Sequence, residues 1–285
     1  IMFCDKVNIP FDVYAFTNEW NRGEISYAAN SDVPHEFHIG KEFSMMNLLT
    51  SRVNRRELTK QMETIYMLAR SYSHHSIDIV PARVGLSGTP LNEALMSLRT
   101  ILPEFKERNG VEKAHVMVLT DGEAGWARYT NEITGYDGDT RISVARLGHH
   151  NAYLRNRKTG NVSQLDRSTI GGLTTCILND LREEFPNSTF TGFRILEKRG
   201  GWFVRQAVQY DEVQLSKWRK EKSIALNNAG YNKYFIVASD TMQESADFSV
   251  GEGATKAKIK SAFTKSLKSK KSNKKILGDF ISLIA

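Results

Sequence analysis

The sequence predicts an α/β protein built on a doubly wound, mostly parallel sheet with helices on both faces. Apolar runs that suit strands alternate along the chain with segments of helical periodicity, which is the order that a parallel sheet requires. The chain has 285 residues, 40% of them apolar, so it is long enough to bury a large core. We expect one α/β domain over residues 1–240 and a Lys-rich C-terminal tail with an amphipathic helix over residues 241–285.

The first half of the chain supplies two strands and two helices. Residues 7–20 are rich in β-branched and aromatic side chains and end in a polar loop, so a strand is predicted there. Residues 55–72 and 91–108 carry apolar side chains at helical spacing, and each is predicted to be an amphipathic helix. Residues 114–119, AHVMVL, form a continuous apolar run that is typical of a strand covered on both faces.

The second half continues the alternation after a long connection. Residues 122–141 are predicted to be a Gly-rich loop, longer than a loop that only connects two elements, and therefore a candidate for a functional loop. Residues 141–165 are predicted to form two strands around a turn near residues 158–161. The remaining predicted elements alternate between helix and strand: a helix at 173–185, a strand at 189–196, a helix at about 210–228 and a strand at 233–239.

The net charge of +7 is concentrated in the tail. Residues 256–275 hold nine lysines and no acidic residue, which leaves 30 basic and 32 acidic residues in the rest of the chain. Apolar residues recur every four positions among these lysines, so they predict an amphipathic helix that either binds a polyanion or packs on the domain with its lysines in water. The candidate polyanion-binding residues are Lys256, Lys258, Lys260, Lys265, Lys268, Lys270 and Lys271.

Several classes of protein are disfavoured by what the sequence lacks. It contains no apolar run of eighteen residues and no signal peptide, so we expect a cytoplasmic protein. Its two cysteines, Cys4 and Cys176, are too few for a disulfide scaffold and belong to no metal-binding pattern. A P-loop, a dinucleotide-binding fingerprint and a nucleophile elbow are all absent from the sequence.

Two polar motifs fall where ligands gather in an open α/β sheet, at the carboxyl ends of its strands. Thr89 precedes Pro90, which is favoured at the first helical position, so Thr89 is the predicted N-cap of the helix at 91–108. Asp121 directly follows the apolar strand, and Gly122 allows the backbone to turn there. Taken singly, these motifs indicate an ordinary cap and an ordinary turn. Taken together, a hydroxyl and a carboxylate are hard oxygen ligands that suit Mg²⁺.

The order of these motifs resembles that of the von Willebrand factor A domain. That domain's metal-ion-dependent adhesion site uses a Thr from one loop and an Asp from a later strand end, as in SGTP (87–90) and TDG (120–122) here. With VNIPFDVYAFTNEW at 7–20, the chain is similar to the A-type domain of the cobaltochelatase family and of its bacteriophage-encoded relatives, over roughly residues 1–240. The resemblance implies a metal-dependent protein-interaction module, without catalytic activity of its own, that holds Mg²⁺ on Thr89 and Asp121 and works with an AAA+ ATPase partner of the chelatase type.

One part of the family pattern is missing from this chain. The family has an Asp-x-Ser-x-Ser loop at the end of its first strand, and neither DRSTI (166–170) nor DFSVG (247–251) matches it. The sequence begins at Ile1, so we expect the first strand and this loop to lie upstream of residue 1 or on a separate chain. Mg²⁺ binding by residues 1–285 is then expected to be weak or absent without that segment.

Other residues near the predicted strand ends are candidates for partner binding. Trp126 lies in the long loop, and Asn18, Trp20 and Arg22 follow the first predicted strand. Two other functions are alternatives: a nucleic-acid-binding protein that acts through the tail and the basic turn at 154–161, or a hydrolase at the Asp121 edge, for which no pair of base and nucleophile is visible. Salt is expected to abolish nucleic-acid binding, whereas EDTA is expected to abolish a metal-bridged contact.

Overall fold

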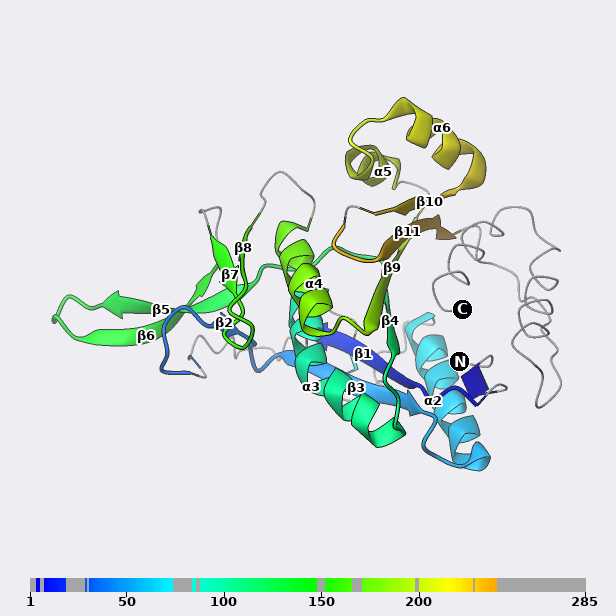
Figure 1. Cartoon of the computed structure of the whole chain (residues 1–285), viewed down its shortest axis with the longest axis horizontal. Coiled ribbons are helices and arrows are strands. Elements are labelled where there is room, and N and C mark those ends of the chain that lie inside the picture. Colours follow the sequence, from blue (N-terminus) through cyan, green and yellow to red (C-terminus); the bar gives the residue numbers. More distant parts are fainter. Residues whose placement is uncertain are drawn as a thin grey trace. The chain divides into compact units, whose positions relative to one another are not determined.

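The protein is a mixed α/β protein (Figure 1). Its chain divides into two compact units. Unit 1 comprises residues 1–9, 106–122 and 153–285, and unit 2 comprises residues 10–105 and 123–152. The computed structural model describes residues 4–5, 8–18, 29, 31–73, 84–85, 88–147, 152–165, 171–197, 200–227 and 229–239. The predicted tail and all of its lysines lie outside these ranges. Among the described helices, none is both long and apolar enough to cross a membrane.

Unit 1 is organised around a four-stranded sheet with the strand order β10, β11, β9, β4. Its strands are β4 (Ala114–Thr120), β9 (Ser188–Leu196), β10 (Ser223–Leu226) and β11 (Lys233–Ala238). β4, β9 and β11 run parallel, and β10 joins β11 in the antiparallel direction. The other described strand pairs of the protein are all antiparallel. The predicted strands at 114–119, 189–196 and 233–239 are therefore confirmed, and they form the parallel part of the fold. The expected cover on both faces of β4 is wrong, because Met117 and Leu119 are more than half exposed.

The helices of unit 1 are α4 (Gly172–Glu184), α5 (Gly201–Ala207) and α6 (Glu212–Glu221). Figure 1 shows α5 and α6 lying together next to β10 and β11. They share a core with these strands through buried side chains that include Val204, Leu215, Ile224 and Ile236. On α4, Ile177, Leu178 and Leu181 are completely buried. The helix predicted at 173–185 is thus confirmed.

The helix predicted at about 210–228 is confirmed in part as α6, but it ends at Glu221 and does not reach residue 228. Gln209 and Tyr210 have positive φ angles of 52° and 61°, so the chain leaves the helical conformation between α5 and α6. Asp211 then starts α6, because its side chain accepts hydrogen bonds from the backbone N–H groups of Val213 and Gln214. Lys222, with a φ angle of 54°, ends α6 in the left-handed conformation. The residues that follow form β10 and not more helix.

Unit 2 contains a two-stranded and a three-stranded antiparallel sheet. The first pairs β1 (Asp12–Asn18) with β3 (Phe43–Thr50). The second has the order β2, β5, β6, with β2 at Phe37–His38, β5 at Arg128–Thr134 and β6 at Thr140–Arg146. The strand predicted within 7–20 is confirmed as β1, whereas β2 and β3 were not predicted.

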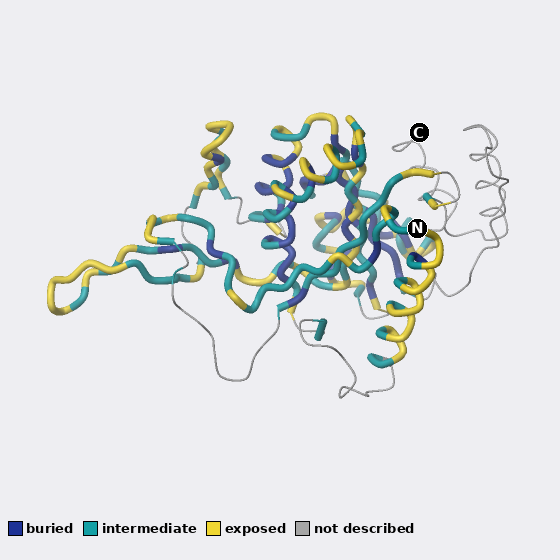
Figure 2. The backbone as a smooth tube through the Cα atoms, turned by 90° about the horizontal axis from the view of Figure 1, so that it is seen from below, coloured by how far each residue is buried: buried dark blue, intermediate teal, exposed yellow. Residues whose placement is uncertain are grey.

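The predicted loop at 122–141 is wrong, because most of it is a hairpin of β5 and β6. The turn lies at residues 135–139, where Gly138 adopts a positive φ angle of 84°. The N–H of Gly135 donates to the carbonyl of Asp139, and the carbonyl of Gly135 accepts from the N–H of Gly138. β2 pairs with only Arg128 and Tyr129 of β5, so the ribbon continues beyond that short sheet as two strands. Figure 2 shows the far end of this hairpin as exposed.

Two helices of nineteen residues each complete unit 2: α2 (Arg55–Ser73) and α3 (Leu91–Asn109), whose final residues from Lys106 belong to unit 1. Both confirm predicted helices. α3 buries an apolar stripe that includes Leu95 and Leu102. On α2, Leu58 is buried, but Met62 and Tyr66 of the predicted apolar face are exposed.

Gly192 is required at the centre of β9. It pairs with Val118 of β4 and Tyr234 of β11. A Cβ atom at this position would lie 2.6 Å from Cδ2 of Tyr234 and 2.8 Å from Cε2 of Tyr231. The two tyrosine rings stack at a centroid distance of 5.4 Å over this glycine, and Tyr231 is buried. The stack therefore depends on the absence of a side chain at residue 192.

We expect Gly192→Ala to lower the free energy of unfolding by about 1–3 kcal/mol, because the added methyl group overpacks a buried aromatic stack. Urea unfolding followed by circular dichroism measures the loss. Gly201→Ala is the matched control, since a Cβ atom there meets nothing within 4 Å, and we expect it to be neutral or stabilising by up to about 1 kcal/mol. Equal losses for the two variants would contradict the prediction.

Candidate functional site

Asp121 lies immediately after β4, in a turn that Thr120 closes with its side chain. The Thr120 hydroxyl donates a hydrogen bond to the carbonyl of Gly122 at 3.0 Å and accepts one from its N–H at 3.1 Å. Asp121 itself is exposed. The turn thus holds a solvated carboxylate at the carboxyl end of a parallel strand, where ligands gather in α/β sheets.

Thr89 takes part in the structure through its carbonyl group. α3 begins at Leu91, and the carbonyl of Pro90 accepts the first helical bond, from Ala94 at 3.0 Å. The carbonyl of Thr89 accepts bonds from Leu91 at 2.8 Å and from Gly125 at 3.0 Å. The prediction that the Thr89 side chain caps the helix is not borne out by any bond among the described residues, because the helix starts one residue later.

Two hydrogen bonds from distant segments hold the chain at residues 84–85, shortly before Thr89. The hydroxyl of Thr17, in β1, donates to the carbonyl of Gly85 at 2.7 Å, and the hydroxyl of Tyr72, near the end of α2, donates to the carbonyl of Val84. A Cβ atom on Gly88 would lie 3.5 Å from Nδ2 of Asn18. Asn18 therefore lies beside the residue that precedes Thr89.

Trp126 lies in the same part of unit 2. It follows Gly125, whose N–H is bonded to Thr89, and its side chain is 63% exposed. Next to it, Ala127 is buried and accepts a backbone bond from Leu147 at 2.9 Å, which anchors the loop. The structure thus brings Asn18, Thr89 and Trp126 into one neighbourhood. The other two candidates, Trp20 and Arg22, lie outside the described residues.

A group of interacting charges lies in unit 2 around the first residue of β5. Arg128 forms an ion pair with Glu42, and both side chains are mostly buried. Burial raises the pKa of Glu93, in the first turn of α3, although Arg128 opposes this shift. Burial and then Arg128 lower the pKa of His38, which pairs with Arg128 across β2 and β5. His38 is 3% exposed, and neither ring nitrogen has a hydrogen-bond partner.

The candidate metal ligands are few. Within the described ranges, no group of three or more His, Cys, Asp or Glu side chains is arranged to hold a metal ion. The Thr89 hydroxyl and the Asp121 carboxylate fit Mg²⁺ in the chemistry of their oxygens, because this ion prefers hard ligands. Their number is small for a dedicated protein site, so waters or a partner's oxygens would complete the coordination shell.

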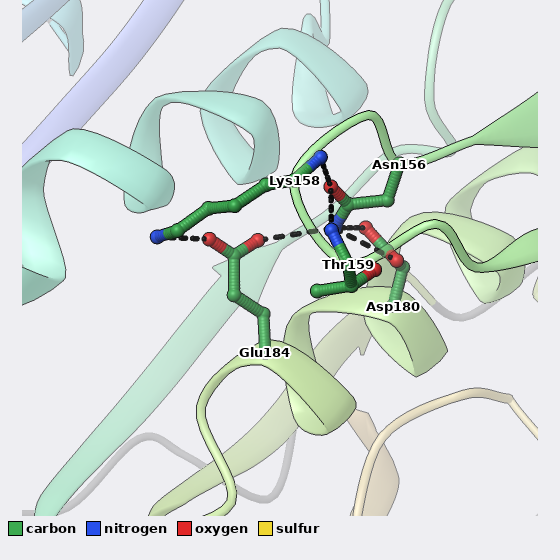
Figure 3. A network of polar contacts seen from close by, with 5 residues as sticks. All are labelled: Asn156, Lys158, Thr159, Asp180 and Glu184. Atoms are coloured by element: carbon green, nitrogen blue, oxygen red, sulfur yellow. Dashed lines mark hydrogen bonds and ion pairs between the residues drawn. The ribbon is translucent and has the colours of Figure 1, made fainter.

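The basic turn predicted near residues 158–161 is confirmed between β7 (Tyr153–Arg155) and β8 (Val162–Gln164). Figure 3 shows how Asn156 holds this turn against α4. Nδ2 of the buried Asn156 donates to both carboxylate oxygens of Asp180, at 3.0 and 3.1 Å, and to Glu184 at 3.2 Å. Its Oδ1 accepts from the backbone N–H groups of Lys158 and Thr159. The Lys158 ammonium, whose side chain is 73% exposed, also contacts Glu184 at 3.0 Å.

Sequence reasoning missed the residues that hold the segments around Thr89 together. Thr17 and Gly85 lie 68 positions apart, and Tyr72 and Gly125 also act through backbone groups of other segments. No local pattern marks such bonds, since every residue has a carbonyl group. Gly125 could have been singled out, because it is a glycine in a predicted loop between the candidate residues Asp121 and Trp126.

Comparison of the chain with protein-family models, with curated proteins and with solved structures finds no match in any of the three. Membership of a family is therefore a proposal for this chain.

The buried imidazole of His38 makes stability depend on pH. Because its pKa is lower in the folded state than the ordinary value of 6.5, the unfolded chain binds this proton more readily, and stability falls as pH drops below about 6.5. We expect His38→Leu to remove this pH dependence. We also expect it to raise the free energy of unfolding by on the order of 1 kcal/mol at about pH 5, because two unpartnered nitrogens are removed. Urea unfolding at about pH 5 and about pH 7.5 tests this, and an unchanged pH profile in the variant would refute it.

The turn between β7 and β8 depends on Asn156. We expect Asn156→Ala to lower the free energy of unfolding by about 1–3 kcal/mol, because buried carboxylate oxygens lose a donor. Asn161→Ala removes a bond to Glu183 that is exposed to solvent, so it should cost less than about 0.5 kcal/mol. Thermal unfolding of both variants makes the comparison, and similar losses would show that the buried network contributes no more than the exposed bond.

Proposed function

We propose that this protein is a metal-dependent protein-interaction module of the von Willebrand A type, similar to that of the cobaltochelatase family. It binds Mg²⁺ and, through the ion, an acidic residue of an AAA+ ATPase partner of the chelatase type. The module carries out no chemical step itself, and ATP hydrolysis in the partner supplies the energy. In this proposal the parallel strands β4, β9 and β11 belong to a doubly wound sheet with helices on both faces.

The hydrogen bond between Thr89 and Gly125 is the observation that supports this proposal most strongly. It holds the start of α3 against the loop that leaves β4, at 3.0 Å. Asp121 precedes Gly125 by four residues, a length of chain that spans at most about 14 Å even when fully extended. A hydroxyl from one segment and a carboxylate from another are the two oxygen types that the proposed metal site requires.

The exposed side chains around Thr89 suit contact with a partner. Trp126 offers a large aromatic surface of the type that dominates protein interfaces. Asn18, which is partly buried, adds an amide beside Gly88. Trp20 and Arg22 remain proposed partner-binding residues and lie outside the described ranges. When bound, Mg²⁺ supplies the positive charge that a partner's carboxylate needs. Asp121 and Thr89 hold the ion, and the rest of its shell comes from water, from the partner and from a segment that carries Asp-x-Ser-x-Ser.

A titration with paramagnetic Mn²⁺ tests the metal site, because Mn²⁺ takes the same hard oxygen ligands as Mg²⁺. We expect the NMR signals of Asp121, Gly122 and Thr89 to broaden together at low Mn²⁺, and Mg²⁺ to reverse the effect. Asp121→Ala should abolish the broadening. The matched control is Asp137→Ala, which removes another exposed carboxylate, at the tip of the hairpin of β5 and β6, and should leave it unchanged.

The partner is tested by the conditions that dissociate it. Binding to a chelatase-type AAA+ ATPase should be lost in EDTA and in the Asp121→Ala variant, while moderate salt has little effect. Binding that salt abolishes and EDTA leaves intact would instead favour the lysines of residues 256–275 as a polyanion-binding segment. Broadening at the hairpin tip alone, or nowhere, would refute the metal site.

A further inference from the structure

β2 is an edge strand of two residues in the three-stranded sheet of unit 2 (Figure 1). It pairs with the first two residues of β5. Beside this short ladder, the N–H of His35 donates to the carbonyl of Thr130 at 2.6 Å, and the N–H of Thr130 donates to the carbonyl of Glu36 at 2.9 Å. Opening of so short a segment costs much less free energy than unfolding of a whole protein, so β2 can separate from β5 by itself.

His38 makes this short contact sensitive to protons. Its side chain is buried, and neither ring nitrogen has a hydrogen-bond partner among the described residues. A neutral imidazole has one N–H donor and one acceptor, whereas an imidazolium has two donors and a positive charge. Protonation in place would therefore bury a charge without an acceptor for either N–H group, which costs more than burying the neutral ring.

The charged groups around His38 come from β5, from the connection between β2 and β3, and from α3. Arg128 lies opposite His38 on β5, and Glu42 lies in the connection and forms an ion pair with Arg128. Glu93, in the first turn of α3, interacts with both members of this pair. Burial is the largest cause of the lowered pKa of His38, and Arg128 lowers that pKa further while Glu42 opposes the shift. The ion pair therefore does not compensate for the burial of the ring.

We propose that protonation of His38 releases β2 from β5 while the rest of the protein stays folded. In the closed state the neutral ring is buried, and in the released state the imidazolium is solvated. The released state binds the proton more readily than the closed state. Closure is therefore most stable above the ordinary pKa of 6.5 and is lost progressively as pH falls below it.

Release of β2 would affect the segment that carries Trp126. Arg128, which pairs with His38, follows Trp126 by two residues and is the first residue of β5. Glu42 leaves β5 together with β2 if the release extends to the connection between β2 and β3, and the ion pair with Arg128 is then lost. Binding of a partner at Trp126 would weaken below about pH 6.5. This consequence rests on the proposed function, whereas the release rests on the burial of His38 and the shortness of β2.

Hydrogen exchange of the full chain, measured residue by residue between about pH 5 and pH 7.5, tests the release. The protection factors of the His35 and Thr130 amides should fall by up to about tenfold for each pH unit below 6.5. Because release exposes little surface, urea below the unfolding transition should hardly change the exchange of these two amides. Amides of β9 in unit 1 should be at least about tenfold better protected at every pH, since they exchange through larger openings.

Two variants identify the titrating group. His38→Gln keeps a polar side chain that does not titrate, and it should make the protection of His35 and Thr130 independent of pH between about 5 and 7.5. The matched control is His115→Gln, which removes a histidine of β4 whose pKa is also lowered by burial. It should leave the pH dependence of the two amides unchanged.

Each outcome supports or overturns the release. Protection of His35 and Thr130 that does not change with pH in the wild-type protein overturns it, and this result needs no variant. Urea dependence equal to that of β9 also overturns it, because β2 would then leave only when the whole protein unfolds. A pH dependence that persists in His38→Gln assigns the proton to another group, such as Glu93, and overturns the role of His38. The Mn²⁺ titration at about pH 7.5 is independent of all three results, so the metal site and the release can fail separately.

Discussion

A parallel strand needs neighbouring strands on both of its edges and packed side chains on both of its faces, and this need determines the structure of unit 1. β9 meets this need: β4 and β11 pair with its two edges, and Gly192 leaves room for the stacked rings of Tyr231 and Tyr234. Phe190 of β9 is completely buried, so packed side chains cover this strand. Among the described strands, β4 is paired on one edge only, and Asp121 follows directly where this strand ends.

Unit 2 depends on a different kind of interaction, the hydrogen bonding of loop carbonyls by distant donors. Thr17 and Tyr72 hold the backbone at Gly85 and Val84, and Gly125 holds Thr89. A loop that is held at several points loses its conformational entropy during folding and not when a ligand binds. These bonds lower the entropic cost of ordering the segments that carry Thr89 and Gly125 when a ligand binds, which suits the proposed partner surface.

The sequence predicted the parts of this fold that have a strong hydrophobic period. The strands β4, β9 and β11 and the helices α2, α3 and α4 lie within about two residues of their predicted bounds. The hairpin of β5 and β6 was missed because its strands are mostly polar and its tip contains two glycines. The helix α6 ended earlier than predicted because Lys222 adopts the left-handed conformation without being a glycine, which no composition rule marks. We predicted Asn18, Thr89 and Trp126 as site residues from their residue types and their positions near strand and helix ends. The bonds that join their segments are long-range, so no local pattern in the sequence marks them.

The small number of protein oxygens at the proposed metal site has a thermodynamic consequence. An ion held by Thr89 and Asp121 alone keeps most of its waters and binds weakly. In the proposed function, a partner's carboxylate that completes the coordination shell would raise the affinity for the ion. By linkage, the ion would raise the affinity for that partner by the same factor. Metal binding and partner binding would therefore reinforce each other.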